Sequence, residues 1–566
     1  MSKMDKAWLY WNTIRSLRPV QIRYQIKNRI LKNQKKKLAG RIEKLRAPEI
    51  LETPHILIPE LDCEKEYLRR FRVEELLENQ IDLLHEMHVI EKNWKVSSAS
   101  HLWNYNLHYL EFLIPLAAKY KITKDERYFL KWKELLESWM EQATGDSLEP
   151  YTISMRIPNL LICRELLSEK IKNTQLEQAL ITSIYQQYRY LLYAQEKALL
   201  ANHYFENLKT LVISSLFFHE LETYHKYFDL FLKEIEEQIL SDGLHFERSL
   251  MYHKIILEDI LRVYVVLKSS NHLCDGEKLV PTIKIMTAAM VNLEEGFPRT
   301  PLFNDSGNNV SKKKDSLLRA AQKICGYEKT AIRSFEASGY YKLHQGETTI
   351  LFDCGDIGPS YMGGHAHCDC LSFELCVQGK ALFVNSGTGQ YQGELRPFFR
   401  STAAHNTIMI DDREQSELWG EHRAARRIRT AKGELKAKTL VGSFQSYQGD
   451  LFRRSFTWKN ERTLVIRDEW RAYHTGRHMA RQFLHLGPDF CYRRNGSQIE
   501  VWEGKRQWAV IWLPAKSDYL IHTEGQLTNY AENFGEYGKK QVLEIRTPFQ
   551  DKAWSQIEIE IRTGEQ

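Results

Sequence analysis

Apolar residues recur at spacings of three and four from about residue 64 to residue 330, which is the period of helices with one buried face. The pattern begins over 67–90 and continues through Leu107, Leu110, Leu113 and Leu116. It predicts further helices over 175–200, 206–222, 226–240, 253–268 and 279–293. Many consecutive helices with short polar breaks favour a helical array or toroid.

The pattern changes near Phe335, where short runs rich in Val, Ile, Phe and Thr alternate with turn residues. Such runs predict strands, and Gln378-Gly379 predicts a hairpin turn between two of them. The predicted strands cover 349–354, 371–377, 381–385, 407–411, 454–458, 463–470, 499–503 and 508–513. This many short strands favour a β-sandwich. We therefore expect an α+β protein with a helical domain over 61–333 and a sandwich over 334–566.

Residues 1–60 form a third segment, helical and basic. Residues 1–46 hold 14 Lys and Arg and two acids, a balance of +12, whereas the whole chain carries only +6. Trp8, Tyr10 and Trp11 are interleaved with these charges. A basic helix with aromatic residues is typical of contact with a membrane surface or a polyanion. A solvated packing helix explains the pattern equally well.

The remaining composition narrows the cellular setting. Nine scattered cysteines include no zinc-type CxxC pair, so we expect reduced thiols rather than a disulfide framework. No apolar signal segment follows the N-terminal charges, and no run of about 18 apolar residues could span a membrane. We expect a cytoplasmic protein, with residues 1–46 as a peripheral contact at the inner membrane face. No nucleic-acid partner is expected.

The strand-rich half contains the string Gly363-Gly364-His365-Ala366-His367-Cys368-Asp369. On an extended chain, residues two apart point to the same face, so His365 and His367 are expected to project together. The glycine pair lets another backbone or a ligand approach closely. Two neighbouring imidazoles suit proton transfer, metal binding, or one of each.

The metal interpretation adds two further residues. Asn385 follows a predicted strand, and His405 ends the segment 400–405. His367, Asn385 and His405 could converge on a metal, although asparagine is a weak zinc ligand. A hydrogen-bonded cluster without metal is the alternative.

The helical half has two polar clusters of its own. In Asn202-His203-Tyr204-Phe205-Glu206, His203 and Glu206 lie three apart and share a helix face, so the glutamate could orient the imidazole. Tyr252 follows a run of titratable residues, and a tyrosine near His or Arg can have a lowered pKa and act as a base or an acid. A helix cap and an ordinary interface tyrosine are the plain alternatives.

Several polar and aromatic side chains suit an acidic sugar. Tyrosine faces stack on sugar rings, and an arginine can grip a carboxylate or sulfate with two hydrogen bonds. Core packing and surface ion pairs are the alternative explanation. The candidate substrate-binding residues are Asn104, Tyr105, His108, Tyr151, Arg156 and Arg248.

Taken in order, the motifs NHYFEN, MYHK, GGHAHCD, VNSGTG and RSTAAHNTIMID resemble the heparinase II/III-like polysaccharide lyases. The resemblance covers most of the chain beyond about residue 60. It implies an (α/α) toroid followed by an antiparallel β-sandwich, and cleavage of uronic-acid polysaccharides by β-elimination. The implied partner is an acidic polysaccharide of the glycosaminoglycan type, similar to heparin or heparan sulfate.

The resemblance also assigns roles to the matched residues. Asn202 and His203 resemble the groups that neutralise the uronate carboxylate, and Glu206 a supporting carboxylate. Tyr252 resembles the tyrosine that moves protons at C-5 and at the leaving oxygen, and His365 the second acid or base. Such amide, imidazole and phenol groups suit this reaction, because an enolate-like intermediate must be stabilised and two protons moved.

His367 and His405 resemble ligands of a structural zinc ion. The third ligand in the family is usually an aspartate, and this chain has Asn385 there, with Asp369 nearby as a substitute. No organic cofactor is implied.

Three other functions remain open at this stage. A C-5 uronyl epimerase uses a similar toroid but returns the proton to C-5 instead of expelling the leaving group. A non-catalytic polysaccharide-binding or assembly protein is the second alternative. A metal-dependent hydrolase built on His365 and His367 is the third. New unsaturated uronates, which absorb ultraviolet light, would distinguish the lyase from the epimerase.

Overall fold

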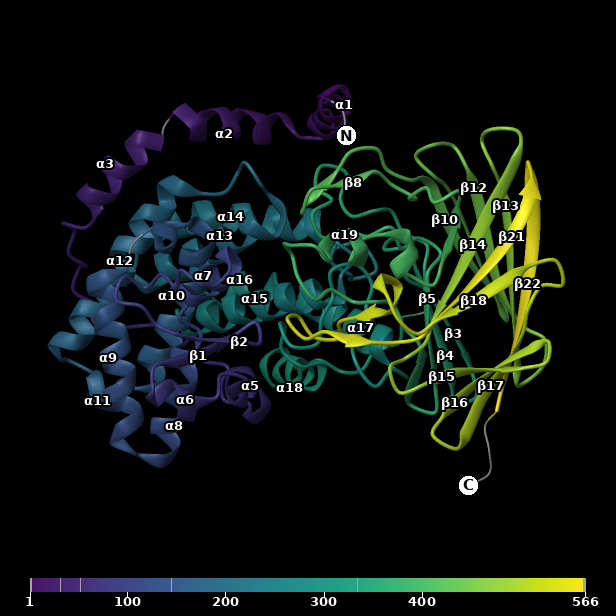
Figure 1. The fold of residues 1–566 in the computed structure, drawn as a ribbon. Helices are drawn as coiled ribbons and strands as arrows, with labels where there is room; N and C mark the ends of the chain where they lie inside the picture. Colours follow the sequence, from purple (N-terminus) through teal and green to yellow (C-terminus); the bar gives the residue numbers. More distant parts are fainter. Residues whose placement is uncertain (1–2, 31, 51, 144, 333, 563–566) are drawn as a thin grey trace.

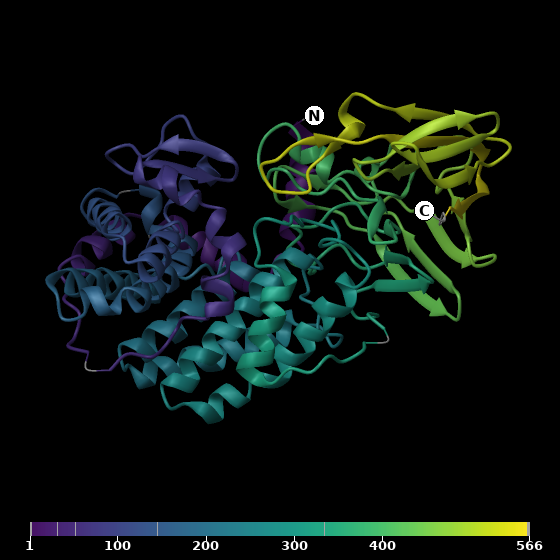
Figure 2. The same cartoon turned by 90° about the horizontal axis from the view of Figure 1, so that it is seen from below.

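The computed structural model describes residues 3–30, 32–50, 52–143, 145–332 and 334–562. Figure 1 shows a helical body beside a strand-rich body, and Figure 2 shows the same two bodies from below; the chain passes from one to the other near α18. This is the predicted order of an (α/α) toroid and an antiparallel β-sandwich. Each of the nine cysteines lies within the described ranges as a free thiol. No helix of the described residues is both long enough and apolar enough to cross a bilayer.

The toroid is built from helices whose apolar stripes pack into one core. Local polar groups fix where several of them begin, as Asp125 and Ser249 each accept a backbone N–H in the first turn of the helix that follows. The helices are α7 (His101–Leu107), α8 (Leu113–Thr123), α9 (Glu126–Gln142), α10 (Pro150–Leu166), α11 (Ser168–Ile171), α12 (Gln175–Ala194), α13 (Ala201–Phe217), α14 (Leu221–Gln238), α15 (Leu250–Ser269), α16 (Leu273–Glu277), α17 (Val280–Glu294) and α18 (Lys314–Cys325).

The prediction of helix throughout 67–90 is wrong. After the short helices α4 (Pro59–Asp62), α5 (Lys65–Arg69) and α6 (Val73–Leu77), the chain forms an antiparallel hairpin of β1 (Gln80–Leu83) and β2 (Glu86–Val89). Its turn residues Leu84 and His85 both have positive φ, which a helix does not allow. The apolar spacing there reflects alternating burial on a strand rather than one helix face.

The sandwich contains one large sheet that packs against two smaller ones, and the core lies between them. Within each sheet the named strands pair antiparallel. The large sheet has the order β10 (Arg429–Lys436), β11 (Thr439–Gln445), β12 (Leu451–Trp458), β13 (Thr463–Arg471), β22 (Lys552–Ile561), β17 (Arg506–Trp512), β16 (Gln498–Glu503) and β15 (Cys491–Asn495). One smaller sheet has the order β18 (Asp518–His522), β21 (Val542–Gln550), β14 (Arg477–His485) and β7 (Ile408–Ile410). The other has the order β3 (Tyr340–Gln345), β4 (Thr348–Asp353), β5 (Phe373–Val377) and β6 (Lys380–Phe383).

The predicted hairpin turn between β5 and β6 is confirmed. Val377 pairs with Lys380, and both Gln378 and Gly379 have positive φ, as a tight two-residue turn requires. The two bodies are joined by a shared apolar cluster that contains Leu250 and Leu293 from helices together with Leu351 from β4. The joint therefore holds α15 and α17 against the sandwich.

The N-terminal segment lies outside both bodies. It consists of α1 (Lys3–Ile14), α2 (Pro19–Ile30) and α3 (Lys32–Ile42), and Figure 1 shows it arching along one side of the molecule. We call residues 4–30 the strap. Its outer surface carries exposed apolar side chains, among them the two exposed tryptophans Trp8 and Trp11. The predicted membrane-surface contact of this segment stays a prediction.

Candidate active site

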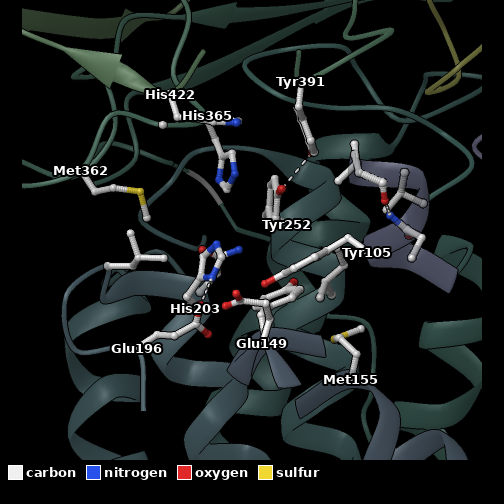
Figure 3. Close-up of a pocket in the computed structure, with 18 of the residues that line it drawn as sticks. Tyr105, Glu149, Met155, Glu196, His203, Tyr252, Met362, His365, Tyr391 and His422 are labelled. Carbon is white, nitrogen blue, oxygen red and sulfur yellow. Dashed lines mark hydrogen bonds and ion pairs between the residues drawn. The ribbon is translucent and has the colours of Figure 1, made fainter. Parts of the chain in front are cut away.

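A cavity of about 950 Å³ lies between the two bodies and is lined by both. Its helical wall includes Tyr105, Tyr151 and His203, and its strand-rich wall includes His365 and Tyr391. Figure 3 shows Tyr105 and His203 on one side of the cavity and His365 and Tyr391 on the other. A cleft of this size, with few convergent polar groups among apolar ones, is typical of a substrate site.

His365 and Tyr252 form the centre of this site. Their rings stack with centroids 4.0 Å apart and planes 15° apart. The Nδ1 atom of His365 lies 2.6 Å from the Oε2 atom of Glu247, which is buried. With Nδ1 donating to the carboxylate, Nε2 of His365 keeps its lone pair and can accept a proton. Burial alone would raise the pKa of the Glu247 carboxyl, but the charge and hydrogen bond of His365 hold it below its usual range.

Tyr252 is a proton donor in this environment. It is the third residue of α15, and the hydroxyl of Ser249 caps that helix by accepting the Tyr252 N–H. Its hydroxyl lies 2.8 Å from that of Tyr391. The expected lowering of its pKa is wrong, because burial raises the pKa of Tyr252 well above the usual value of tyrosine. The phenol is therefore protonated at neutral pH.

The opposite wall presents Asn202 and His203 from the first turn of α13. The backbone enters that helix through Leu200 and Ala201, which both have positive φ, a strained conformation for side-chain-bearing residues. The first-turn position aims the positive end of the helix dipole at the cavity. The buried amide oxygen of Asn202 has no hydrogen-bond partner among the described residues. The N-terminus of α13 and the His203 ring suit an anionic group, whereas the Asn202 oxygen can only accept a hydrogen bond.

His203 is oriented by Glu196, and the predicted pairing with Glu206 is wrong. The Nδ1 atom of His203 lies 3.1 Å from Oε1 of Glu196. Burial lowers the pKa of His203, but Glu196 raises it further, so the net pKa lies above the usual value for histidine. Glu206 faces away and forms a buried ion pair with Lys209, whose Nζ also lies 2.8 Å from Asp259.

Tyrosine rings form the floor between these walls. The rings of Tyr105 and Tyr151 are roughly parallel at 6.5 Å, Tyr109 lies 6.0 Å from Tyr151, and the Tyr151 ring is 4.6 Å from that of His203. All of them line the cavity. Flat, partly polar rings at this spacing offer stacking surfaces to sugar rings. The structure thus places two of the predicted substrate-binding residues, Tyr105 and Tyr151, beside His203.

Four other predicted substrate-binding residues do not line the cavity, and their side chains bond other parts of the protein instead. Asn104 bonds the backbone of Val96 through both ends of its amide. His108 accepts from the indole of Trp139, and burial lowers its pKa to about 3. Arg248 donates to the carbonyls of residues 246, 338 and 358. These three side chains are buried in the fold.

Arg156 is the fourth of these corrections. Its guanidinium is fully buried and donates to the Gln187 side chain and to the carbonyls of His108 and Ser147, all within 2.7 Å. Each nitrogen of the guanidinium thus donates to the protein, and burial lowers the pKa of the group to about 9. Because Arg156 is fully buried and does not line the cavity, it is not placed to bind a substrate carboxylate.

The prediction that His365 and His367 project together is also wrong. Residues 363–371 form an irregular loop without a strand. His365 faces the cavity, whereas His367 is buried with Nε2 2.8 Å from Oδ1 of Asp305. The glycines do permit a close approach, since a Cβ on Gly363 would lie 2.7 Å from the Cβ of Ala424. One short motif therefore serves two separate clusters.

The second cluster has the donor set of a metal site. His367, Asp369 and His405 each offer a ligand atom within 4.8 Å of the others. One nitrogen of each histidine bonds a protein oxygen, and the other, Nδ1 of His367 and Nε2 of His405, is buried without a partner among the described residues. Two lone-pair nitrogens and a carboxylate fit a zinc ion.

Asn385, predicted as the third ligand, has another position. Its Oδ1 accepts from the hydroxyl of Ser372 at 2.6 Å and lies 3.1 Å from Nδ1 of His405. That contact fixes the His405 ring with Nδ1 toward Asn385, so Nε2 points away from Asn385. Asn385 therefore orients His405, and the carboxylate that lies with the two histidines is that of Asp369.

Sequence reasoning missed three residues of the cavity site: Glu247, Glu196 and Tyr391. Glu247 stands in the charged run before Tyr252, but nothing local shows that it meets His365, 118 positions away. Glu196 precedes His203 by seven residues across a loop, which no helix-face rule joins. Tyr391 follows the Gly-rich segment 387–389. Only the fold brings them together.

Comparisons with known proteins agree with this architecture. The family model described as heparinase II/III N-terminus matches residues 71–328, and the one described as heparinase II/III-like, C-terminal, matches 328–560. A heparin-sulfate lyase of Bacteroides thetaiotaomicron is 24% identical over 437 residues, covering 67% of this chain and 60% of the relative. One from Pedobacter heparinus is 23% identical over 362 residues, covering 56% and 53%. The chain thus spans little more than half the length of these curated relatives.

Solved structures share the fold. A crystal structure of heparinase III has a TM-score of 0.71 at 17% identity, covering 94% of this chain and 90% of the other. A heparan sulfate lyase from Pedobacter heparinus has a TM-score of 0.58 at 18% identity, covering 94% and 88%. At these identities the likeness establishes the arrangement of toroid and sandwich.

Proposed function

Because the chain belongs to the heparinase II/III-like family, we propose that it is a polysaccharide lyase that cleaves an acidic, uronate-containing polysaccharide by β-elimination. The substrate class we propose is glycosaminoglycan, similar to heparin or heparan sulfate, on which the relatives are named to act. One observation carries the proposal: the stacked pair His365 and Tyr252 faces Asn202 and His203 across a single cavity.

The reaction begins with binding of the uronate carboxylate. The amide of Asn202, the protonated ring of His203 and the N-terminus of α13 neutralise its charge. Withdrawal of electron density makes the proton on C-5 more acidic and stabilises the enolate-like intermediate. Burial lowers the pKa of His203, but Glu196 raises it further, so that the charged form of the ring is favoured relative to a free histidine.

Two proton transfers complete the elimination. Nε2 of His365 removes the proton from C-5, and Glu247 stabilises the imidazolium that forms. The bond from C-4 to the glycosidic oxygen breaks, a double bond forms between C-4 and C-5, and the phenol of Tyr252 donates its proton to the leaving oxygen. The hydroxyl of Tyr391, 2.8 Å away, is placed to stabilise the phenolate left behind.

The cavity also offers positive charge to a polyanion. Arg29, Lys312, Arg423 and Arg427 line it, and within the described parts of the chain none of the four has a carboxylate within ion-pair distance. The other lining cations, such as Arg70 with Glu111, are already paired. Local basic contacts of this kind attract an acidic chain and are screened by salt.

We also propose that His367, His405 and Asp369 hold a zinc ion with a structural role. When bound, the metal would fix the loop that carries His365, and no step of the elimination requires it. Elemental analysis of the purified protein, combined with thermal unfolding before and after a chelator, tests this. We expect bound zinc and a lower melting temperature after its removal; a metal-free protein that the chelator leaves unchanged would refute the site.

A panel of polysaccharides tests the activity. Heparan sulfate, heparin, an unsulfated uronate polymer and a neutral glucan are each incubated with the protein, and unsaturated uronates are measured by ultraviolet absorbance. We expect double bonds from at least one uronate polymer and none from the glucan. Exchange of the C-5 hydrogen with heavy water, without double bonds, would instead identify an epimerase.

A further inference from the structure

We propose that the cavity is closed at two sides and accepts the end of a polysaccharide chain rather than its interior. This rests on the proposed lyase activity and adds the mode of attack to it. The closure comes from the strap on one side and from the β1–β2 turn on another. Each of them touches both bodies, so a chain passing through the cavity would meet protein at both crossings.

The strap is attached to the helical body beside the catalytic wall. The side-chain amide of Gln21 is buried and donates to the carbonyl of Leu199 at 3.1 Å, immediately before the strained entry to α13. The guanidinium of Arg18 forms an ion pair with Glu237 of α14 at 2.8 Å. Gln21 belongs to the cavity lining. The strap is thus part of the cavity wall near His203.

The strap is also attached to the strand-rich body. The indole N–H of Trp419, in the short strand β8 (Leu418–Trp419), donates to Oγ1 of Thr13 at 2.9 Å. The ring of Tyr10 meets the Trp419 ring at 4.8 Å, and the guanidinium of Arg423 lies over Tyr10. Figure 1 shows α1 next to β8 and α2 above α14.

Arg18 ties the two attachments together. Its guanidinium lies 3.9 Å from the ring centroid of Tyr361, while the Tyr361 hydroxyl donates to the same Glu237 at 2.6 Å. One arginine from the strap, one glutamate from the helical body and one tyrosine from the strand-rich body thus form a single node. Opening this side of the cavity would break all three contacts.

The second crossing joins the β1–β2 turn to the loop around Phe534. His85 pairs with Glu536 at 3.0 Å, and Asn309 exchanges two hydrogen bonds with the backbone of Phe534, at 2.8 and 2.9 Å. The backbones touch here, because a Cβ on Gly535, whose φ is +86°, would lie 2.0 Å from the carbonyl oxygen of Leu84. No side chain larger than hydrogen fits at that point.

The closure has a consequence for the substrate. An enzyme that cuts within a long polymer needs a cleft from which the chain leaves at both sides. Here the cavity volume of about 950 Å³ holds a few sugar rings, and strap residues such as Thr13 and Leu17 line the cavity, where they would obstruct a longer chain on that side. Chain-end attack then releases small unsaturated products one after another. If the strap only stabilised the fold, loosening it would not change the sizes of the products.

The first experiment uses the wild-type protein alone. One uronate polymer is split into samples of different mean length, and initial rates of double-bond formation are compared at equal mass. A chain-end enzyme works in proportion to the number of ends, so we expect the rate to rise as the chains shorten. Equal rates on long and short chains would overturn the proposal.

The second experiment loosens the strap in the full-length chain. The double variant Tyr10→Ala with Arg18→Ala removes the Tyr10–Trp419 ring contact and the Arg18–Glu237 ion pair, and Trp8→Ala with Arg23→Ala is the matched control on the exposed surface of the strap. Mean polymer length is measured by size exclusion as a function of double bonds formed. We expect the wild type and the control to leave the polymer long while small products accumulate, and the loosened variant to shorten it from the first bonds.

The outcomes separate this inference from the activity on which it rests. Double bonds with the same length profile in wild type and loosened variant overturn chain-end attack and leave the lyase intact. A wild type that shortens the polymer from the first bonds does the same. No double bonds from any of the three proteins would overturn the lyase proposal itself.

Discussion

Replacing Glu247 with glutamine isolates the role of the carboxylate behind His365. The side chain is buried and lies 2.6 Å from the imidazole, but it does not line the cavity. A carboxylate and an imidazolium with centres roughly 4 Å apart interact by about 4 kcal/mol at an effective dielectric constant of ~20. Glutamine keeps an acceptor oxygen without the charge, so we expect a loss of about 2–4 kcal/mol, or roughly 30- to 1,000-fold in kcat.

The assay is the initial rate of ultraviolet-absorbing product at saturating and limiting substrate. Because Glu247 acts through His365 rather than on the sugar, kcat should fall while KM changes little. Glu294→Gln is the matched control, since it removes an equally buried carboxylate, paired with Lys254, away from the cavity. It should lower stability and spare kcat. A Glu247→Gln protein with kcat within about threefold of wild type would refute the assigned role.

The remaining predictions concern the proton donor, the scaffold, acid stability and the strap. Tyr252→Phe should fold normally and keep less than about a tenth of wild-type kcat, an effect above roughly 1.4 kcal/mol, and a higher residual rate would refute the donor. Arg156→Ala should lower the free energy of unfolding, because the buried carbonyls it leaves unpaired cost roughly 1–3 kcal/mol each, whereas a raised KM at unchanged stability would restore its substrate role. Burial lowers the pKa of His245 to about 4 and of His253 to about 3, so the unfolded chain binds more protons below about pH 6.5, and denaturant midpoints should fall as pH drops from there toward 4; a flat profile would contradict this. Anionic vesicles should co-sediment the protein more than neutral ones, because residues 1–46 carry a balance of +12, and alanine at Trp8 and Trp11 should weaken co-sedimentation with both; equal co-sedimentation with the two kinds of vesicle would refute the contact.

Periodicity predicted the fold because it reports burial, which both halves of the chain display over many residues. The helical spacing was misleading only where a segment was short. Over 80–89 the apolar positions are compatible with either period, and the positive φ values of Leu84 and His85 decide for a hairpin. The two-residue turn signal Gln378-Gly379 was sufficient, because glycine marked a position of positive φ.

The site was only partly predictable, because its geometry depends on contacts distant in sequence. Tyr252 and His203 could be proposed from their motifs, since each stands in the first turn of a helix. The divergence of His365 and His367 could not, because their partners Glu247 and Asp305 lie 118 and 62 residues away. The burial of Arg156 likewise follows from carbonyls on other segments. An arginine near a motif can bond either the protein backbone or a ligand, and only the packing around its guanidinium shows which of the two it does.

The bond between Thr13 and Trp419 joins residues that are 406 positions apart. At roughly 5–20 residues added per second during synthesis, the strap leaves the ribosome about 20–80 s before its anchoring tryptophan exists. Throughout that interval the helical body can fold while the strap has nothing to bind on the far side. Closure on the strap side therefore has to follow the synthesis of β8, and a nascent protein truncated before β8 would lack the contact between Thr13 and Trp419.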